Sequence, residues 1–226
     1  ENLDADSRLE LILFRPGAGA TTPLTRVFDW APGGYVQLLS HTDPVSSMNV
    51  SHFRSASQLE LFEIAPDDVR LRDLNGTVLL RASTAVSPWT GVGVAANGME
   101  LDGDPVSELG LVQHATQNDE QTLFFDYVNG AFTYRWAATS WALGGSANLD
   151  GDADSEVLGF NWLDGRYAFL SGANGASELE LPEFTFFDNS NVYPLDVDGD
   201  GRAEVFAMRP KSLTVTPLVR AYKWVA

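Results

Sequence analysis

The feature that most constrains the fold of this chain is a nine-residue acidic loop that recurs at a near-constant spacing. The loop is clearest within PLDVDGDGRAEVF, residues 194–206, and it returns within NLDGDADSEVLGF, residues 148–160. Two further copies open ELDGDPVSELGLV, residues 100–112, and NLDADSRLELILF, residues 2–14. The glutamates that close the loops are Glu10, Glu108, Glu156 and Glu204. The last three lie 48 residues apart, and the first interval of 98 residues is about twice that spacing.

The long first interval predicts a further copy near residue 60. The segment 52–64, HFRSASQLELFEI, supplies it: Glu60 stands in the closing position and an apolar run follows, although the other acids are lost. Five repeats of about 48 residues therefore cover the chain, and a period of this length indicates a repeat architecture. The expected repeats are about 1–47, 48–95, 96–143, 144–191 and 192–226.

Each loop leads into a short apolar run, such as ELGLV at 108–112 and EVFAM at 204–208. Short apolar runs bounded by turn residues predict buried strands. Asn129-Gly130 predicts a tight hairpin between two further strands of the third repeat. Four short antiparallel strands in each repeat of this length are typical of a β-propeller blade. We therefore expect an all-β fold, a single β-propeller domain over residues 1–226 with five four-stranded antiparallel blades.

The first blade is expected to lack its innermost strand. In every other repeat a strand precedes the acidic loop, whereas the chain is already inside its first loop at Asn2. Residues 204–226 are expected to supply the last three strands of the fifth blade, which leaves no spare strand there. A larger chain or an assembly with another chain would then complete the first blade.

Side-chain oxygens at alternate loop positions, closed by a carboxylate, are what a hard cation such as Ca²⁺ requires. Positions 1, 3, 5 and 9 offer side-chain oxygens, and position 7 can offer a backbone carbonyl. The four acidic loops contain no His or Cys, which points away from zinc. An EF-hand loop would close at position 12, which is Ala207 in the last repeat. The predicted ligands are Asn2, Asp4, Asp6, Arg8 and Glu10; Glu100, Asp102, Asp104, Val106 and Glu108; Asn148, Asp150, Asp152, Asp154 and Glu156; and Asp196, Asp198, Asp200, Arg202 and Glu204.

These loops and the repeat length resemble the FG-GAP/VCBS repeats of integrin α-subunit propellers and of many secreted bacterial proteins. In that family the loop joins the first two strands of a blade and binds calcium. The segment 196–204 matches the family pattern throughout, whereas Ala153 and Pro105 replace the second glycine in two other loops, and proline cannot adopt a positive φ. The first loop has Ala5 and Ser7 in place of both glycines. The resemblance implies three to four Ca²⁺ ions, with none in the second repeat, where the ligand positions hold His52, Arg54, Ala56 and Gln58.

The charge of the chain is concentrated in these loops, which hold 16 of its 31 acidic residues. The formal net charge of −17 argues against binding to nucleic acid, which depends on Lys and Arg at the phosphates. No apolar stretch approaches the roughly 18 residues of a membrane span, so no membrane insertion is expected.

No catalytic residues are predicted, because no nucleophile, metalloprotease or phosphate-loop motif is present and the three histidines occupy unrelated repeat positions. Four tryptophans near loops are candidates for stacking on a sugar or anchoring a partner: Trp30, Trp89, Trp136 and Trp141. Trp162 is expected to pack between blades. We expect a non-catalytic, calcium-stabilised recognition module, secreted or on the cell surface, that binds a glycan or protein ligand in adhesion. The alternatives are a lectin with sugar pockets between blades and a polysaccharide-degrading enzyme on a propeller scaffold.

Overall fold

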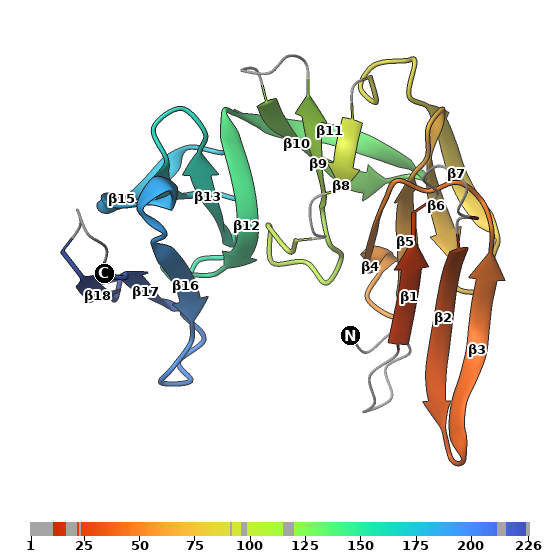
Figure 1. The fold of residues 1–226 in the computed structure, drawn as a ribbon, viewed down its shortest axis with the longest axis horizontal. Coiled ribbons are helices and arrows are strands. Elements are labelled where there is room, and N and C mark those ends of the chain that lie inside the picture. Colours follow the sequence, from red (N-terminus) through yellow and green to blue (C-terminus); the bar gives the residue numbers. More distant parts are fainter. Residues whose placement is uncertain are drawn as a thin grey trace. The chain divides into compact units, whose positions relative to one another are not determined.

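The structure, a computed structural model, describes residues 11–16, 22, 24–90, 92–95, 99–114, 120–211 and 216–224. Over these residues the protein is all-β, as predicted, with antiparallel strands in five sheets and one short 3₁₀ turn, η1 (Phe186–Asp188) (Figure 1). Within this part of the chain no helix has the length and apolar character needed to cross a membrane.

The strands of each sheet follow one another in chain order. Sheet 1 contains β1 (Leu11–Arg15), β2 (Leu24–Ala31) and β3 (Gly34–His41). Sheet 2 contains β4 (Ser47–Ser55), β5 (Gln58–Ile64), β6 (Asp68–Asp73) and β7 (Val78–Ser83). Sheet 3 contains β8 (Val92–Ala95), β9 (Leu109–His114), β10 (Glu120–Val128) and β11 (Ala131–Thr139). Sheet 4 contains β12 (Trp141–Ala147), β13 (Glu156–Asn161), β14 (Arg166–Leu170) and β15 (Ser177–Thr185), and sheet 5 contains β16 (Asn191–Leu195), β17 (Glu204–Arg209) and β18 (Leu218–Tyr222).

The sheets match the sequence repeats, with one correction. Sheets 2, 3 and 4 have four strands, of which the first precedes the loop, as expected. The three described strands of sheet 1 all follow its loop, and the predicted lack of an innermost strand in the first repeat stays a prediction. In sheet 5, however, the described residues after Glu204 form two strands rather than the expected three.

Contacts divide the chain into two compact units. The first comprises residues 1–98, 105–114 and 124–134, and the second comprises 99–104, 115–123 and 135–226. This division does not test the predicted single domain over residues 1–226, which stays a prediction.

In the first unit, each sheet packs an apolar face on the next one. Val27 and Leu39 of sheet 1 form a buried cluster with Leu59 and Leu61 of sheet 2. Aromatic rings continue this packing toward sheet 3, where Phe125 on β10 stacks on Trp89 at 5.2 Å between ring centroids. Because alternate side chains of a strand point to opposite faces, each sheet can pack on a neighbour at both faces.

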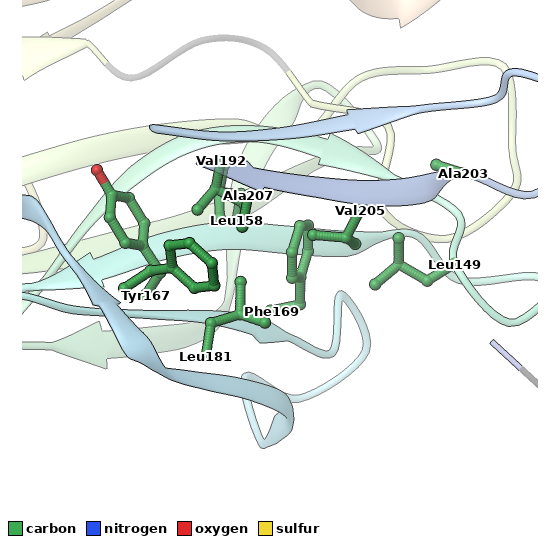
Figure 2. Packing of buried hydrophobic residues seen from close by; sticks show 10 residues of the cluster. Leu149, Leu158, Tyr167, Phe169, Leu181, Val192, Ala203, Val205 and Ala207 are labelled. Atoms are coloured by element: carbon green, nitrogen blue, oxygen red, sulfur yellow. The ribbon is translucent and has the colours of Figure 1, made fainter. Parts of the chain in front are cut away.

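In the second unit, sheets 4 and 5 share one apolar core, in which Phe169 and Phe184 are fully buried (Figure 2). Figure 2 shows side chains of β13, β14 and β15 pointing toward those of β16 and β17. The buried cluster consists of Leu149, Leu158, Tyr167, Phe169, Leu181, Phe184, Val192, Ala203, Val205 and Ala207. Leu149 and Ala203 belong to acidic loops, so this core supports the loops directly.

Candidate metal-binding loops

Paired strands hold the two ends of each complete acidic loop in the second unit. Glu156 begins β13 and pairs with Ala147, and Glu204 begins β17 and pairs with Leu195. The nine residues therefore connect two antiparallel strands, as the sequence predicted. We refer to the segments 52–60, 100–108, 148–156 and 196–204 as loops 2, 3, 4 and 5.

The closing glutamate is anchored in the same way in loops 4 and 5. The backbone N–H at position 2 donates to its Oε2, from Leu149 to Glu156 at 2.6 Å and from Val197 to Glu204 at 3.1 Å. Both glutamates are buried. One carboxylate oxygen of each glutamate, Oε2, is thus held by the backbone, which leaves Oε1 for other partners.

The turn inside each loop is also built from side-chain oxygens. The N–H of the glycine at position 4 donates to the side chain at position 1, as from Gly151 to Asn148 at 2.7 Å. Gly103, Gly151 and Gly199 occupy this position with φ of 77°, 85° and 76°, a region that favours glycine. The N–H at position 5 donates to Oδ1 at position 3, so the carboxylate retains Oδ2 for another partner.

The structure brings three acids together in each of loops 4 and 5. One oxygen from each member of a group lies within 4.8 Å of the others, which is close enough for a shared metal ion. The groups are Asp150, Asp152 and Glu156, and Asp196, Asp198 and Glu204. Positions 3 and 9 are present in both, as the spacing predicted. Four predicted ligands lie in these loops but outside the groups: Asn148, Asp154, Asp200 and Arg202. The predicted ligands of loop 3 are divided between the units, with Glu100, Asp102 and Asp104 in the second and Val106 and Glu108 in the first.

The predicted ligands of the first loop lie outside the described residues, and they are Asn2, Asp4, Asp6, Arg8 and Glu10.

Loop 4 concentrates negative charge around a buried carboxyl group. Burial, together with the charges of Glu178 and Asp150, raises the pKa of Glu156 to about 7 against the hydrogen bond from Leu149. Burial also raises the pKa of Glu178, with Asp150 and Asp152 contributing. Glu178 lies on β15, outside the loop, so the spacing of the motif could not reveal it as a fifth acidic group at this site.

Loop 5 contains a cation of the chain itself. The Nζ of Lys223 lies 2.5 Å from Asp198 Oδ2, 3.1 Å from Asp200 Oδ2 and 2.9 Å from Glu204 Oε1. Hydrogen bonds to Asp198, Glu204 and Asp200 raise the pKa of Lys223 above its ordinary value. No feature of the nine-residue motif pointed to this lysine.

Loops 2 and 3 each have an arginine at one of their acids. In loop 2, Arg54 Nε donates to Glu60 Oε1 at 2.9 Å, while Phe53 N donates to Glu60 Oε2 at 3.0 Å. Glu60 is therefore anchored at Oε2 as in loops 4 and 5, and a guanidinium group lies at Oε1. The absence of an ion in loop 2 stays a prediction. In loop 3, Arg135 donates to Asp102 Oδ2 at 2.7 Å.

The loops of successive repeats are joined by backbone hydrogen bonds from position 8. Ser107 donates to the carbonyl of His52 at 2.8 Å within the first unit. Within the second unit, Ser155 donates to Leu101 at 3.2 Å and Ala203 donates to Asn148 at 2.7 Å. A loop therefore lies against the loop of the preceding repeat in each of these pairs.

The predicted ligand-binding tryptophans require a correction. Trp89 and Trp136 are buried, since Trp89 stacks on Phe125 and Trp136 Nε1 donates to the carbonyl of Gly172 at 2.7 Å. Neither ring is available to a ligand, because both fill the space between sheets. Trp141 is half-buried at the start of β12, and Trp30 remains exposed in contact with Tyr35.

An exposed aromatic patch lies elsewhere in the second unit, and we call Trp162, Leu163, Phe186 and Phe187 the aromatic patch. The exposed fractions of Trp162 and Phe187 are 42% and 62%. Phe160 stacks on Phe186 and meets Trp162 edge to face, which holds the patch in place. The expectation that Trp162 packs between blades is wrong, because the turn that ends β13 carries the ring to the surface. The Asp164-Gly165 pair, a turn signal directly after Trp162 and Leu163, indicated in the sequence that these side chains lie at a surface turn.

The comparisons with known proteins give a likeness of fold only. No family model matches the chain, and no curated protein matches it. A solved structure of the rhamnogalacturonan lyase YesW is similar with a TM-score of 0.59 and 13% identity, over 97% of this chain and 47% of the lyase chain. A protein of unknown function from Bacteroides caccae is similar with a TM-score of 0.45 and 8% identity, over 95% of this chain and 72% of that one. This chain thus spans about half the length of the lyase.

Proposed function

We propose that this chain is a calcium-stabilised, propeller-like recognition module that works outside the cytoplasm. The observation that carries the proposal is the shared construction of loops 4 and 5. In both, the backbone anchors the closing glutamate and three acids converge within 4.8 Å.

Calcium is the ion that these donors fit. Every predicted side-chain ligand atom in loops 4 and 5 is an oxygen. Oxygen ligands favour Ca²⁺, which takes six to eight of them at roughly 2.3–2.6 Å. A divalent ion would also relieve the repulsion among the acids of a chain with a net charge of −17. Extracellular calcium, at about millimolar concentration, is sufficient to fill modular sites of this kind.

A propeller arrangement is supported by the way that neighbouring sheets and loops meet. Sheets 1 and 2 share one buried cluster, and sheets 4 and 5 share another. The position-8 hydrogen bonds place the loops of successive repeats against one another. In this arrangement the ions would stabilise the loops within each unit.

The recognition surface in this proposal is the aromatic patch. Exposed aromatic rings beside polar groups suit the apolar face and the hydroxyls of a sugar. Asp164 and Arg166 lie next to the patch on the same hairpin and pair with each other at 2.6 Å. A glycan is therefore our preferred ligand, and a protein partner in adhesion is the other.

A glycan-array screen of the chain, in calcium and in chelator, tests this proposal. We expect binding in calcium, loss of binding in chelator and loss in Trp162→Ala. Trp30→Ala is the matched control, since it removes an exposed ring of the first unit. Binding that survives Trp162→Ala unchanged would refute the assignment of the patch, and a chain that takes up no calcium would refute the role of the loops.

A second candidate is an enzyme that acts on an acidic polysaccharide. It rests on a cavity of about 260 Å³ lined by Arg70, Arg72, Arg81, Asp43 and Val78. Behind it, His41 Nε2 lies 2.7 Å from the buried Glu63, which also accepts from Arg72 at 3.2 Å. The guanidinium groups could bind a uronate, and the likeness to a rhamnogalacturonan lyase makes this substrate class worth testing. Appearance of an unsaturated uronate product in the wild type and not in His41→Ala would favour the enzyme.

A further inference from the structure

Lys223 is placed in loop 5 by the register of its sheet rather than by a chance contact. β18 pairs with β17 so that Tyr222 lies opposite Val205. Lys223 directly follows the end of β18, and Glu204 directly precedes Val205 on β17, so the antiparallel register brings lysine and closing glutamate together. The ammonium group then contacts Asp198, Asp200 and Glu204 at 2.5–3.1 Å.

The ammonium lies where a metal ion would need to lie. Asp198 and Glu204 belong to the group of acids that could share an ion, and Lys223 contacts one oxygen of each. A Ca²⁺ ion at roughly 2.3–2.6 Å from the same oxygens would leave no room for the ammonium. The two cations therefore exclude each other at this site.

Loop 2 has a cationic side chain of this protein at its closing glutamate. There the ligand positions before the closing glutamate have no acids, and Arg54 pairs with Oε1 of the buried Glu60. Glu60 and Glu204 have the same backbone anchor at Oε2, so Arg54 and Lys223 occupy equivalent places. Among the residues that the structure describes, no Lys or Arg forms an ion pair with the acids of loop 4, although the Arg202 side chain lies against Gly151.

We propose that Lys223 is a built-in cation of loop 5 that competes with Ca²⁺, so that loop 5 binds calcium more weakly than loop 4. This inference rests on the proposed calcium binding of the loops. By linkage, calcium weakens the docking of Lys223 by the same factor by which docked Lys223 weakens calcium binding. Lys223 and its neighbour Trp224 also line a cavity of about 120 Å³ with Leu149 and Ala203, so release of the lysine would reach the contact between loops 4 and 5.

The test is a calorimetric titration of the metal-stripped chain with CaCl₂. We expect a tighter and a weaker class of sites in the wild type: Asp150→Asn removes one site from the tighter class and Asp198→Asn removes one site from the weaker class. Lys223→Gln should tighten the weaker class by at least about fivefold, the lower end of typical coupling between sites. Lys211→Gln is the matched control, because it removes the same charge from an exposed lysine, and it should leave both classes unchanged.

A second measurement separates failure of this inference from failure of calcium binding. In chelator, Lys223→Gln should lower Tm, because three acids lose their cation, and the loss should be smaller when Asp198→Asn is also present. An unchanged weaker class in Lys223→Gln, or loss of the tighter class in Asp198→Asn, overturns the competition. Absence of coupling in chelator overturns the role of Lys223 as the cation of the loop. If no variant binds calcium but the coupling is present, the proposed function fails while that role of Lys223 is supported.

Discussion

Replacing Glu156 by Gln should change the stability of this chain in opposite directions with and without calcium. Glu156 is buried, and burial together with the charges of Glu178 and Asp150 raises its pKa from 4.5 to about 7 despite the hydrogen bond from Leu149. The ionised form is therefore unfavourable in the ion-free folded chain. Gln removes the charge and keeps an oxygen that can accept the hydrogen bond from Leu149.

The magnitudes of the two effects follow from the pKa shift and from mass action. A shift from 4.5 to about 7 corresponds to about 3 kcal/mol once the group is ionised in both states. Solvent at the exposed side of the loop screens part of this, so we expect the variant to gain about 1–2 kcal/mol in chelator at pH 8. Calcium at about 100 times Kd stabilises the folded wild type by about 2.7 kcal/mol. The variant loses this stabilisation because it lacks the closing ligand. The wild type should then be more stable by about 1 kcal/mol, or about 2–4 °C in Tm for a chain of this length.

The assay is thermal unfolding at pH 8, in chelator and in excess calcium. We expect the order of the two Tm values to reverse between these conditions. Glu180→Gln is the matched control, since it removes an exposed carboxylate from β15 and should stay within about 0.5 kcal/mol in both. A Glu156→Gln variant that is less stable than the wild type in chelator would refute the electrostatic reasoning, and an equal gain from calcium in both proteins would refute the ligand role.

Three further predictions concern other parts of the structure. Arg54→Met should destabilise the chain by about 2 kcal/mol, because it leaves the buried Glu60 without its partner, and an unchanged midpoint in urea unfolding would contradict this. Phe169→Ala should cost about 3–5 kcal/mol, because the ring is fully buried between sheets 4 and 5; a smaller loss in the same assay would mean that this core is loose. In chelator, the contribution of Glu156 to stability should be greatest below pH 4.5, its ordinary pKa, and should be lost as the pH rises through about 7. Tm measured across this pH range should show that fall in chelator and not in calcium.

Much of the loop chemistry could be predicted from the sequence, because it depends on residues that are close together in the chain. The 48-residue spacing located the closing glutamates, and Glu60, Glu156 and Glu204 all lie on strands with the same backbone anchor. The positive φ at Gly151 and Gly199 follows from the turn that the motif demands. These features are local, so periodicity and turn chemistry were sufficient to identify them.

The remaining features were decided by the packing of strands that are distant in the chain. Lys223 reaches loop 5 because β18 pairs with β17, the strand that carries the closing glutamate, and Glu178 lies on β15, which β14 separates from the loop 4 strand β13. Trp89, expected near a loop, is buried, and Trp162, expected between blades, is exposed. Burial depends on which sheet covers a ring and not on the residues around it in sequence. The sequence by itself determined where the acidic loops lie. Only the tertiary structure decided which of these places the protein fills with its own side chains, because that requires charges from separate strands to meet.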